Sequence, residues 1–179
     1  MRPNHVIKSA HDAGYTRANG FSLWGENGID LADMGQGSIG NCWFISGAAT
    51  MAERPGRIDK VFDNVGLNDA GFYQVQMYKL GSPITIQIDD KLPLTENSQT
   101  VYAEVSKDGA LWGPLIEKAF AKYHGNYDQL VAGVAGRAIG TLTGAPYETL
   151  STDEFDEESL WQMINDHDEK NFMFNAGSN

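Results

Sequence analysis

A glycine-rich turn that runs directly into an apolar segment is the feature that most constrains the fold of this chain. The turn carries three glycines between residues 35 and 40, and the only cysteine, Cys42, stands at the junction. Apolar side chains then recur at mixed spacings of three and four residues, a period typical of a mostly buried helix; they are Trp43, Ile45, Ala48, Ala49 and Ala52. Pro55 and Gly56 end the pattern. The segment therefore predicts a buried helix whose first residue is Cys42.

A position at a helix N-terminus suits a nucleophilic cysteine. Unpaired backbone N–H groups and the positive end of the helix dipole stabilise a thiolate relative to a thiol. Gln36 lies six residues before Cys42, and a turn through Gly37 and Gly40 could bring its amide beside the sulfur, where it could donate a hydrogen bond to an oxyanion. A lone cysteine in a globular domain is more often structural, but the glutamine, the glycines and Trp43 favour a reactive one.

Residues 36–44 resemble the active-site segment of calpains, the intracellular calcium-dependent cysteine endopeptidases with a papain-like core. The resemblance implies that Cys42 is the nucleophile and that Gln36 contributes to the oxyanion hole. Calpains usually carry an aspartate directly before the cysteine, whereas this chain has Asn41, which keeps the size and the hydrogen-bonding capacity but not the charge. We expect this exchange to be tolerated.

The composition fits one globular domain and disfavours several classes of partner. The 179 residues are 41% hydrophobic and 11% aromatic, which suits a packed core. Asp and Glu number 24 against 13 Lys and Arg, and the formal charge of −11 disfavours nucleic acid and anionic membranes. The sequence has no membrane-spanning apolar run, no signal-peptide core at its N-terminus and no second cysteine for an internal disulfide. It therefore predicts a soluble cytoplasmic or otherwise intracellular protein.

The loop before the nucleophile turn is a candidate calcium site. In calpains an aspartate nine residues before the cysteine, backbone carbonyls and a later glutamate bind Ca²⁺, an oxygen-only set of the kind that this ion requires. By resemblance, Asp33 matches the aspartate, and Glu26 and Gly28 stand where the carbonyl donors are expected. The later glutamate is replaced by Ala110, with Asp108 nearby.

Two interpretations of this loop stay open. The arginine that in calpains helps to link calcium binding to closure of the active site is Leu31 here. Asp33 could therefore bind Ca²⁺ as a possible cofactor, or it could simply cap and order its own loop.

A β-hairpin is predicted between residues 73 and 88. Apolar and polar residues alternate in residues 73–78 and again in residues 84–88, and residues 80–83 between them suit a turn. Asp89 and Asp90 follow the second strand. Because adjacent strand residues point to opposite faces, the two carboxylates favour a structural role over a metal site.

Residues 111–123 predict an amphipathic helix. Apolar residues form one stripe along it, and Glu117, Lys118 and Lys122 are expected to lie off that stripe. Such a stripe is typical of a protein core, so we assign it no chemistry. Both this helix and the hairpin resemble the corresponding segments of calpains.

The last third of the chain carries weaker signals. Gly133, Gly136 and Gly140 predict a glycine-rich loop, which does not suffice to indicate phosphate binding. The resemblance places Gly133 in the substrate cleft, although turn geometry alone would also explain it, and Trp43 is the second candidate substrate-binding residue. The acidic residues 151–158 lead into a short helix around residues 160–164 without EF-hand spacing, and residues 172–174 look like the start of a strand.

A general base for thiol proteolysis is missing from the predicted site. Such a base is usually a histidine that is oriented by Asn or Asp. None of the four histidines stands in a context that resembles the calpain histidine, which in that family comes from a second half of the core; they are His5, His11, His124 and His167. We expect the chain to stop where that second half would begin, and the isolated chain to hydrolyse peptides little or not at all.

The combined prediction is an α+β lobe of a papain-like cysteine protease, with a central nucleophile helix and a small antiparallel sheet. Residues 1–20 are a polar N-terminal lead-in, and residues 21–179 are the first subdomain of a calpain-like core whose other half would supply His and Asn. The favoured function is that of a calpain-type endopeptidase acting on intracellular proteins. The alternative is a non-catalytic protein-interaction or regulatory module; acyl transfer by a transglutaminase-like site lacks a supporting motif.

Overall fold

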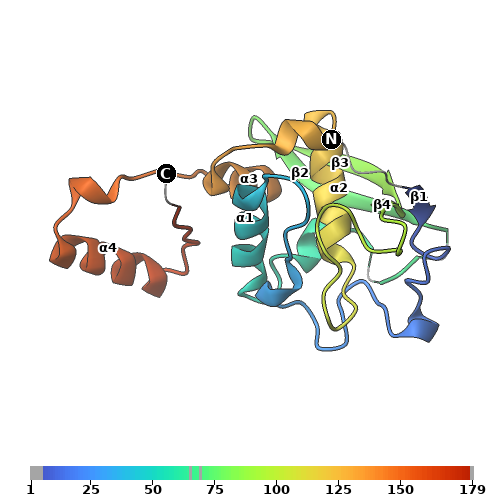
Figure 1. Ribbon diagram of the computed structural model, residues 1–179. Helices are drawn as coiled ribbons and strands as arrows, with labels where there is room; N and C mark the ends of the chain where they lie inside the picture. The colour runs from blue at the N-terminus through green and yellow to red at the C-terminus, as the bar shows by residue number, and fades with distance from the viewer. Residues whose placement is uncertain (1–5, 65, 69, 178–179) are drawn as a thin grey trace.

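Helix α1, Cys42–Ala52, begins at the residue that the sequence predicts (Figure 1). The structure is a computed structural model that describes residues 6–64, 66–68 and 70–177. Most of α1 is buried, namely Trp43, Phe44, Ile45, Gly47, Ala48, Met51 and Ala52. The helix packs against α3, Ala135–Thr143, at Gly47, where an added Cβ would lie 2.9 Å from the Cβ of Ala138. The missing side chain at position 47 therefore allows this close crossing.

Helix α2, Trp112–His124, supplies the second wall of the core. Its predicted apolar stripe is buried, and Phe120 joins it to α1: the Phe120 and Phe44 ring centroids lie 4.4 Å apart, and the Phe120 and Trp43 centroids 5.6 Å. Each large aromatic side chain buried in this way contributes roughly 2–3 kcal/mol. This aromatic cluster fixes α1 relative to α2.

Two small antiparallel sheets complete the α+β arrangement predicted from the sequence. The predicted hairpin is confirmed, but its turn is the two residues Leu80 and Gly81, both at positive φ, rather than four. In the second sheet, residues 6–9 pair with residues 91–94, which directly follow the hairpin. The strands are β1, Val6–Ser9; β2, Phe72–Lys79; β3, Ser82–Asp89; and β4, Lys91–Leu94, with β1 paired to β4 and β2 to β3.

Two expectations for the C-terminal third were wrong, and a third, the helix after the acidic stretch, was confirmed with wider bounds. Gly136 and Gly140 lie in helix α3 rather than in a loop, and their missing side chains leave room for the ring of Tyr147 against this helix. The helix expected after the acidic stretch is α4, Glu157–Glu169, and it is longer than expected. The Asp156 side chain caps it by accepting a hydrogen bond from Ser159 N. Residues 172–174 form no strand.

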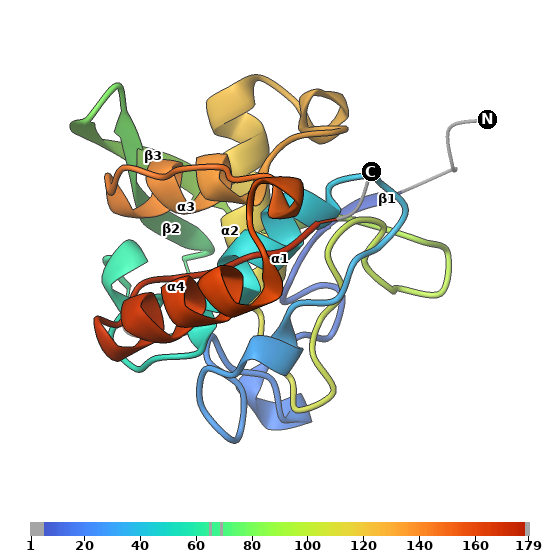
Figure 2. The same ribbon diagram turned by 90° about the vertical axis from the view of Figure 1, so that its left-hand side faces the viewer.

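Helix α4 lies to one side of α1, and the chain then returns to α1 (Figures 1 and 2). No residue of α4 is buried. The returning segment is held by Asn175, which bonds to Ser46 and Thr50 on α1. Short 3₁₀ helices connect the main elements at Arg17–Asn19, Leu31–Asp33, Asp59–Val61, Tyr127–Leu130 and Thr152–Glu154. Within the described residues, no helix has both the length and the apolar character needed to cross a membrane.

Candidate active site

Cys42 is the first residue of α1, and its side chain is exposed. An asparagine before a helix usually accepts a hydrogen bond from an N–H of the first turn, but the Asn41 side chain makes no such bond. The first N–H groups of a helix have no intrahelical acceptor. In α1, Phe44 N and Ile45 N donate to the Asn41 carbonyl oxygen, which leaves the N–H groups of Cys42 and Trp43 to stabilise an anion at this end of the helix.

The Gln36 side chain bonds within the turn that leads to Cys42. Its Nε2 donates to the Ile39 carbonyl oxygen over 2.6 Å, and its side chain stays partly exposed. A side-chain amide nitrogen carries two N–H bonds, so the second remains available to an oxyanion. The nucleophile and a side-chain donor thus belong to one turn.

The nucleophile turn, residues 35–41, is held against residues 101–104. Ser38 N and Oγ both donate to the Val101 carbonyl oxygen, over 3.0 and 2.8 Å. Glu104 N donates to the Gly35 carbonyl oxygen over 2.9 Å. Gly37 passes so close that an added Cβ would lie 1.9 Å from the Tyr102 carbonyl oxygen. Only glycine permits this contact between two backbones.

The Asn41 amide reaches inward to Glu117 on α2. Asn41 Nδ2 donates to Glu117 Oε1 over 2.6 Å, and Ala103 N donates to Glu117 Oε2 over 2.9 Å. Glu117 is 1% exposed, so its expected place off the buried stripe was wrong. Burial raises the pKa of Glu117 to about 7, although both hydrogen bonds oppose this shift.

The raised pKa of Glu117 predicts a pH-dependent stability. Because the native state keeps the proton to higher pH than the unfolded chain, the stability due to this group is lost as pH rises from about 4.5 to 7. We expect the free energy of unfolding of the wild type to fall by about 2 kcal/mol between pH 5 and 7.5 relative to Glu117→Gln. Urea titrations of both proteins at the two pH values measure this change in the free energy of unfolding. Parallel pH dependences of the wild type and Glu117→Gln would contradict a raised pKa of Glu117.

Gly133 and Trp43, the two predicted substrate-binding residues, lie against each other. A Cβ on Gly133 would lie 2.4 Å from Trp43 Cε2, so the chain crosses the indole in direct contact. Trp43 Nε1 donates to the Leu130 carbonyl oxygen over 2.8 Å, and Ala132 N donates to the Gly40 carbonyl oxygen over 3.0 Å. Residues 130–133 are thereby docked beside the nucleophile turn, and Gly133 itself is exposed.

Asp33 is buried and orders the loop before the nucleophile turn. Its Oδ2 accepts hydrogen bonds from Asp30 N over 2.9 Å and from Trp112 Nε1 over 2.8 Å. Asp30 in turn accepts from Ala32 N, which closes a capping box. Burial raises the pKa of Asp33, and the nearby charge of Asp108 adds to this rise. These contacts account for a loop-ordering role.

Asp108 lies against the predicted calcium loop. Its carboxylate accepts from Asn27 N over 3.2 Å and from Ser106 Oγ, and its backbone oxygen accepts from Glu26 N over 3.2 Å. A Cβ on Gly25 would lie 2.4 Å from this carboxylate. In the part of the chain that the structure describes, no three His, Cys, Asp or Glu side chains gather in a metal-binding group.

The described histidines occupy other surroundings. The His124 ring lies tilted against Phe120 and edge-on to Tyr123, and burial lowers the pKa of His124. His167 lies on α4, with Nδ1 at 2.6 Å from the Met163 carbonyl oxygen. Of the histidines placed by the structure, none shares a hydrogen bond with Cys42; His5 lies outside the described residues.

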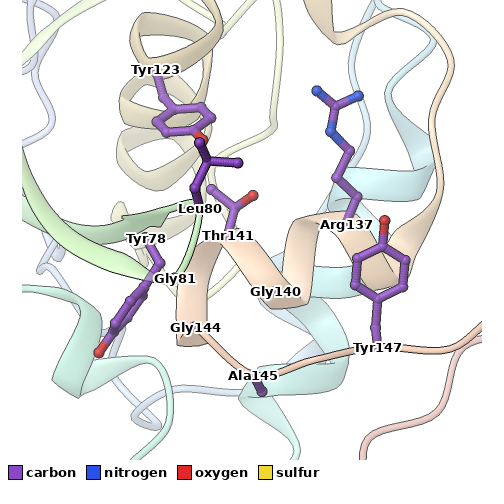
Figure 3. Close-up of a pocket in the computed structure, with 10 residues that line it drawn as sticks. All are labelled: Tyr78, Leu80, Gly81, Tyr123, Arg137, Gly140, Thr141, Gly144, Ala145 and Tyr147. Atoms are coloured by element: carbon purple, nitrogen blue, oxygen red, sulfur yellow. The ribbon is translucent and has the colours of Figure 1, made fainter.

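A shallow pocket lies between the tip of the β2–β3 hairpin, α2 and α3 (Figure 3). Leu80 and Tyr123 line one side, and Arg137 and Tyr147 the other. Neither Cys42 nor Gln36 belongs to its lining. We therefore assign the pocket no part in thiol chemistry.

Glu117 is the site residue that sequence reasoning misplaced. A charged side chain beside an apolar stripe is ordinarily solvent-exposed. The overlooked signal lies one helical turn to either side, where Pro114 and Ala121 are apolar and both are buried. A glutamate flanked in this way faces the core.

Comparison with known proteins agrees with this geometry. A family model described as calpain family cysteine protease matches residues 2–179. Calpain-type cysteine protease DEK1 from Arabidopsis thaliana is 30% identical over 184 residues, which cover 99% of this chain and 8% of that protein. The protein of the same name from Zea mays is 31% identical over 156 residues, covering 84% and 7%, and Calpain-12 from Mus musculus is 34% identical over 125 residues, covering 68% and 17%.

The chain spans less than a fifth of the length of these relatives. The family match nevertheless extends over nearly all of its own residues, and the α+β fold places Cys42 at the start of a buried helix. The chain is a calpain-like cysteine protease domain and belongs to the calpain family of cysteine proteases.

Proposed function

We propose that this domain is the nucleophile-bearing half of a calpain-type endopeptidase that cleaves peptide bonds in intracellular proteins. The observation that carries the proposal is the uncapped N-terminus of α1, where exposed Cys42 follows the turn that holds the Gln36 amide. The Cys42 thiolate attacks the peptide carbonyl carbon, and the N–H groups of α1 and Gln36 stabilise the oxyanion. The intermediate then collapses to an acyl thioester as the leaving amine takes a proton, and water releases the acid and regenerates Cys42.

We propose that the proton for the leaving amine comes from outside the residues described here. A histidine oriented by an asparagine performs this step in thiol proteases of this type. We propose that a second half of the protease core supplies both residues, since none of the placed histidines is bonded to Cys42. On this proposal the isolated chain has an incomplete catalytic set.

The function is tested by supplying that half. We expect the chain alone to leave a fluorogenic peptide intact, and the chain mixed with the His- and Asn-bearing half of a calpain-type relative to hydrolyse it. Cys42→Ala is the matched control and should abolish the gained activity. Peptide binding without any hydrolysis, unchanged in Cys42→Ala, would instead favour the non-catalytic interaction module.

An intracellular location follows from the same proposal. The sequence contains one cysteine, which must remain a free thiol to act as nucleophile. Reducing compartments keep thiols in this form. Protein and peptide substrates in the cytoplasm are therefore the partners that we propose.

We also propose a calcium site in the loop that precedes the nucleophile turn. The carboxylates of Asp33 and Asp108 and the backbone carbonyls of Glu26 and Gly28 form an all-oxygen set of the type that Ca²⁺ prefers. The contact of Asp108 with this loop supports the proposal, because it adds a second acidic ligand where the calpain glutamate is replaced by Ala110. The N–H donors on Asp33 Oδ2 leave its other oxygen for the ion.

Calcium binding predicts a thermal shift that depends on Asp108. We expect Ca²⁺ at about 10 mM, above the affinity range of most calcium sites, to raise the melting temperature of the wild type by roughly 2–5 °C. Asp108→Asn should lose most of this shift, whereas Asp153→Asn, in the exposed acidic stretch outside the loop, should keep it. Equal melting temperatures of the wild type with and without Ca²⁺ would assign Asp33 to loop order alone.

A further inference from the structure

The side chain of Asn41 points away from the helix that it precedes. Its amide is fully buried and donates to Glu117 Oε1 instead of accepting from the first turn of α1. Among the residues that the structure describes, no donor reaches Asn41 Oδ1. A buried oxygen without a partner costs free energy. The contact with Glu117 must therefore compensate for the inward orientation.

The Asn41 amide has a competing position close by. Phe44 N already donates to the Asn41 carbonyl oxygen over 2.8 Å, so Trp43 N is the first-turn donor that an asparagine cap would use. Rotation of the amide toward α1, together with a change of the Asn41 ψ from 28° to the extended value usual before a helix, would let Oδ1 accept from Trp43 N. That bond would occupy a donor next to Cys42 and place a partial negative charge beside the thiolate. A capped α1 would therefore stabilise an anion less well.

We propose that Glu117 is a positioning residue that keeps the N-terminus of α1 uncapped by holding the Asn41 amide in the core. The bond from Ala103 N to Oε2 fixes the Glu117 carboxyl group in this orientation. Glu117 acts through Asn41 and touches no substrate. The inference rests on the proposed function, because an uncapped terminus matters only where Cys42 acts as a nucleophile.

Among the described residues that line the small pocket at the Glu117 side chain, none carries a positive charge. The lining consists of apolar residues, Thr100, and Tyr102 and Tyr127, whose rings stack with centroids 3.9 Å apart. These two tyrosines are the other titratable groups that line the pocket, and burial raises the pKa of Tyr127, so it stays neutral at physiological pH. The two N–H donors are therefore the principal partners of the Glu117 carboxyl group.

The rate of Cys42 alkylation by iodoacetamide across pH 6–9 tests the proposal on the whole 179-residue chain. We expect Glu117→Leu, which releases Asn41, to lower the rate about fivefold to tenfold, the equivalent of one helix cap. Glu117→Gln can donate to Asn41 Oδ1 and accept from Ala103 N, so its rate should stay within about twofold of the wild type. Circular dichroism establishes that each variant is folded.

The Asn41 side chain supplies the decisive controls. Asn41→Ala cannot cap α1, so in the Glu117→Leu background it should restore the alkylation rate to within about threefold of the wild type. Asn41→Ser is a strong cap that is too short to reach Glu117, so it should react several-fold more slowly than Asn41→Ala. A merely structural role of Glu117 predicts no such rescue.

Two results would overturn the proposal. The first is a folded Glu117→Leu variant that reacts as fast as the wild type, or a double variant that stays as slow as Glu117→Leu. The second is an Asn41→Ser variant that reacts as fast as Asn41→Ala, which decides the matter even where Glu117→Leu does not fold. Failure of the proposed function looks different: the wild-type Cys42 would react no faster than in the urea-unfolded chain.

Discussion

Replacing Gly37 with alanine is expected to separate the nucleophile turn from residues 101–104. The added Cβ would lie 1.9 Å from the Tyr102 carbonyl oxygen and 2.6 Å from the Val101 carbonyl oxygen, and backbone atoms cannot rotate aside. The turn must then separate from residues 101–104 and lose both bonds from Ser38 to Val101. We expect Gly37→Ala to lower the free energy of unfolding by about 3–4 kcal/mol, and the iodoacetamide rate of Cys42 to fall because the displaced turn no longer holds the N–H groups that stabilise the thiolate.

Gly40→Ala is the matched control within the same turn. Only Val131 Cγ1 lies within 4 Å of a Cβ at position 40, at 3.8 Å, and Gly40 does not have a positive φ. We therefore expect this variant to unfold within about 0.5 kcal/mol of the wild type, as measured by urea titration. A Gly37→Ala protein as stable and as reactive as Gly40→Ala would show that the turn does not need its contact with Tyr102.

Local patterns predicted the elements that carry the site. The start of α1 at Cys42 follows from a glycine-rich turn that meets a helical apolar period, and both signals lie within a few residues of each other. The β2–β3 hairpin follows from alternation on either side of a short polar turn, and its turn needs positive φ at Leu80 and Gly81. Such signals are readable because their cause is local.

Contacts between distant segments could not be predicted in this way. Asn41 meets Glu117 across 76 residues of sequence, and Asn27 meets Asp108 across 81, so no period or spacing links either pair. The resemblance to calpains marked Asn41 and Ala110 as departures, with Asp108 near the second, but it could not show the partners of Asn41 and Asp108. The structure supplies the partners, and with them the physical consequence of each departure.

Glycine was the least reliable sequence signal. Gly133, Gly136 and Gly140 together indicated a loop, but two of them lie in α3 and make room for Tyr147. Glycine marks close approach as well as turns. Whether a glycine marks a turn or a close approach depends on the residue that lies against it. At Gly133 that residue is Trp43, which lies outside the loop.

Replacing Gly133 with alanine is expected to displace Trp43 from the core. The added Cβ would lie 2.4–2.8 Å from three atoms of the indole, which is 7% exposed and packs edge-on against Phe120. The ring cannot shift without losing its bond to the Leu130 carbonyl oxygen. We expect Gly133→Ala to lower the free energy of unfolding by about 2–3 kcal/mol. Urea titration measures this loss.

A second substitution at Trp43 separates this steric cause from a general effect on the loop. Trp43→Phe removes the six-membered ring atoms that the new Cβ would meet, at a cost of its own of roughly 1–2 kcal/mol from the smaller ring and the lost bond to Leu130. Because the clash is then relieved, the double variant should lose about 1 kcal/mol less stability than the sum of the two single variants. Additive losses would mean that Gly133 is required by the conformation of residues 130–133. A positive coupling would instead identify Trp43 as the surface over which the chain crosses at Gly133.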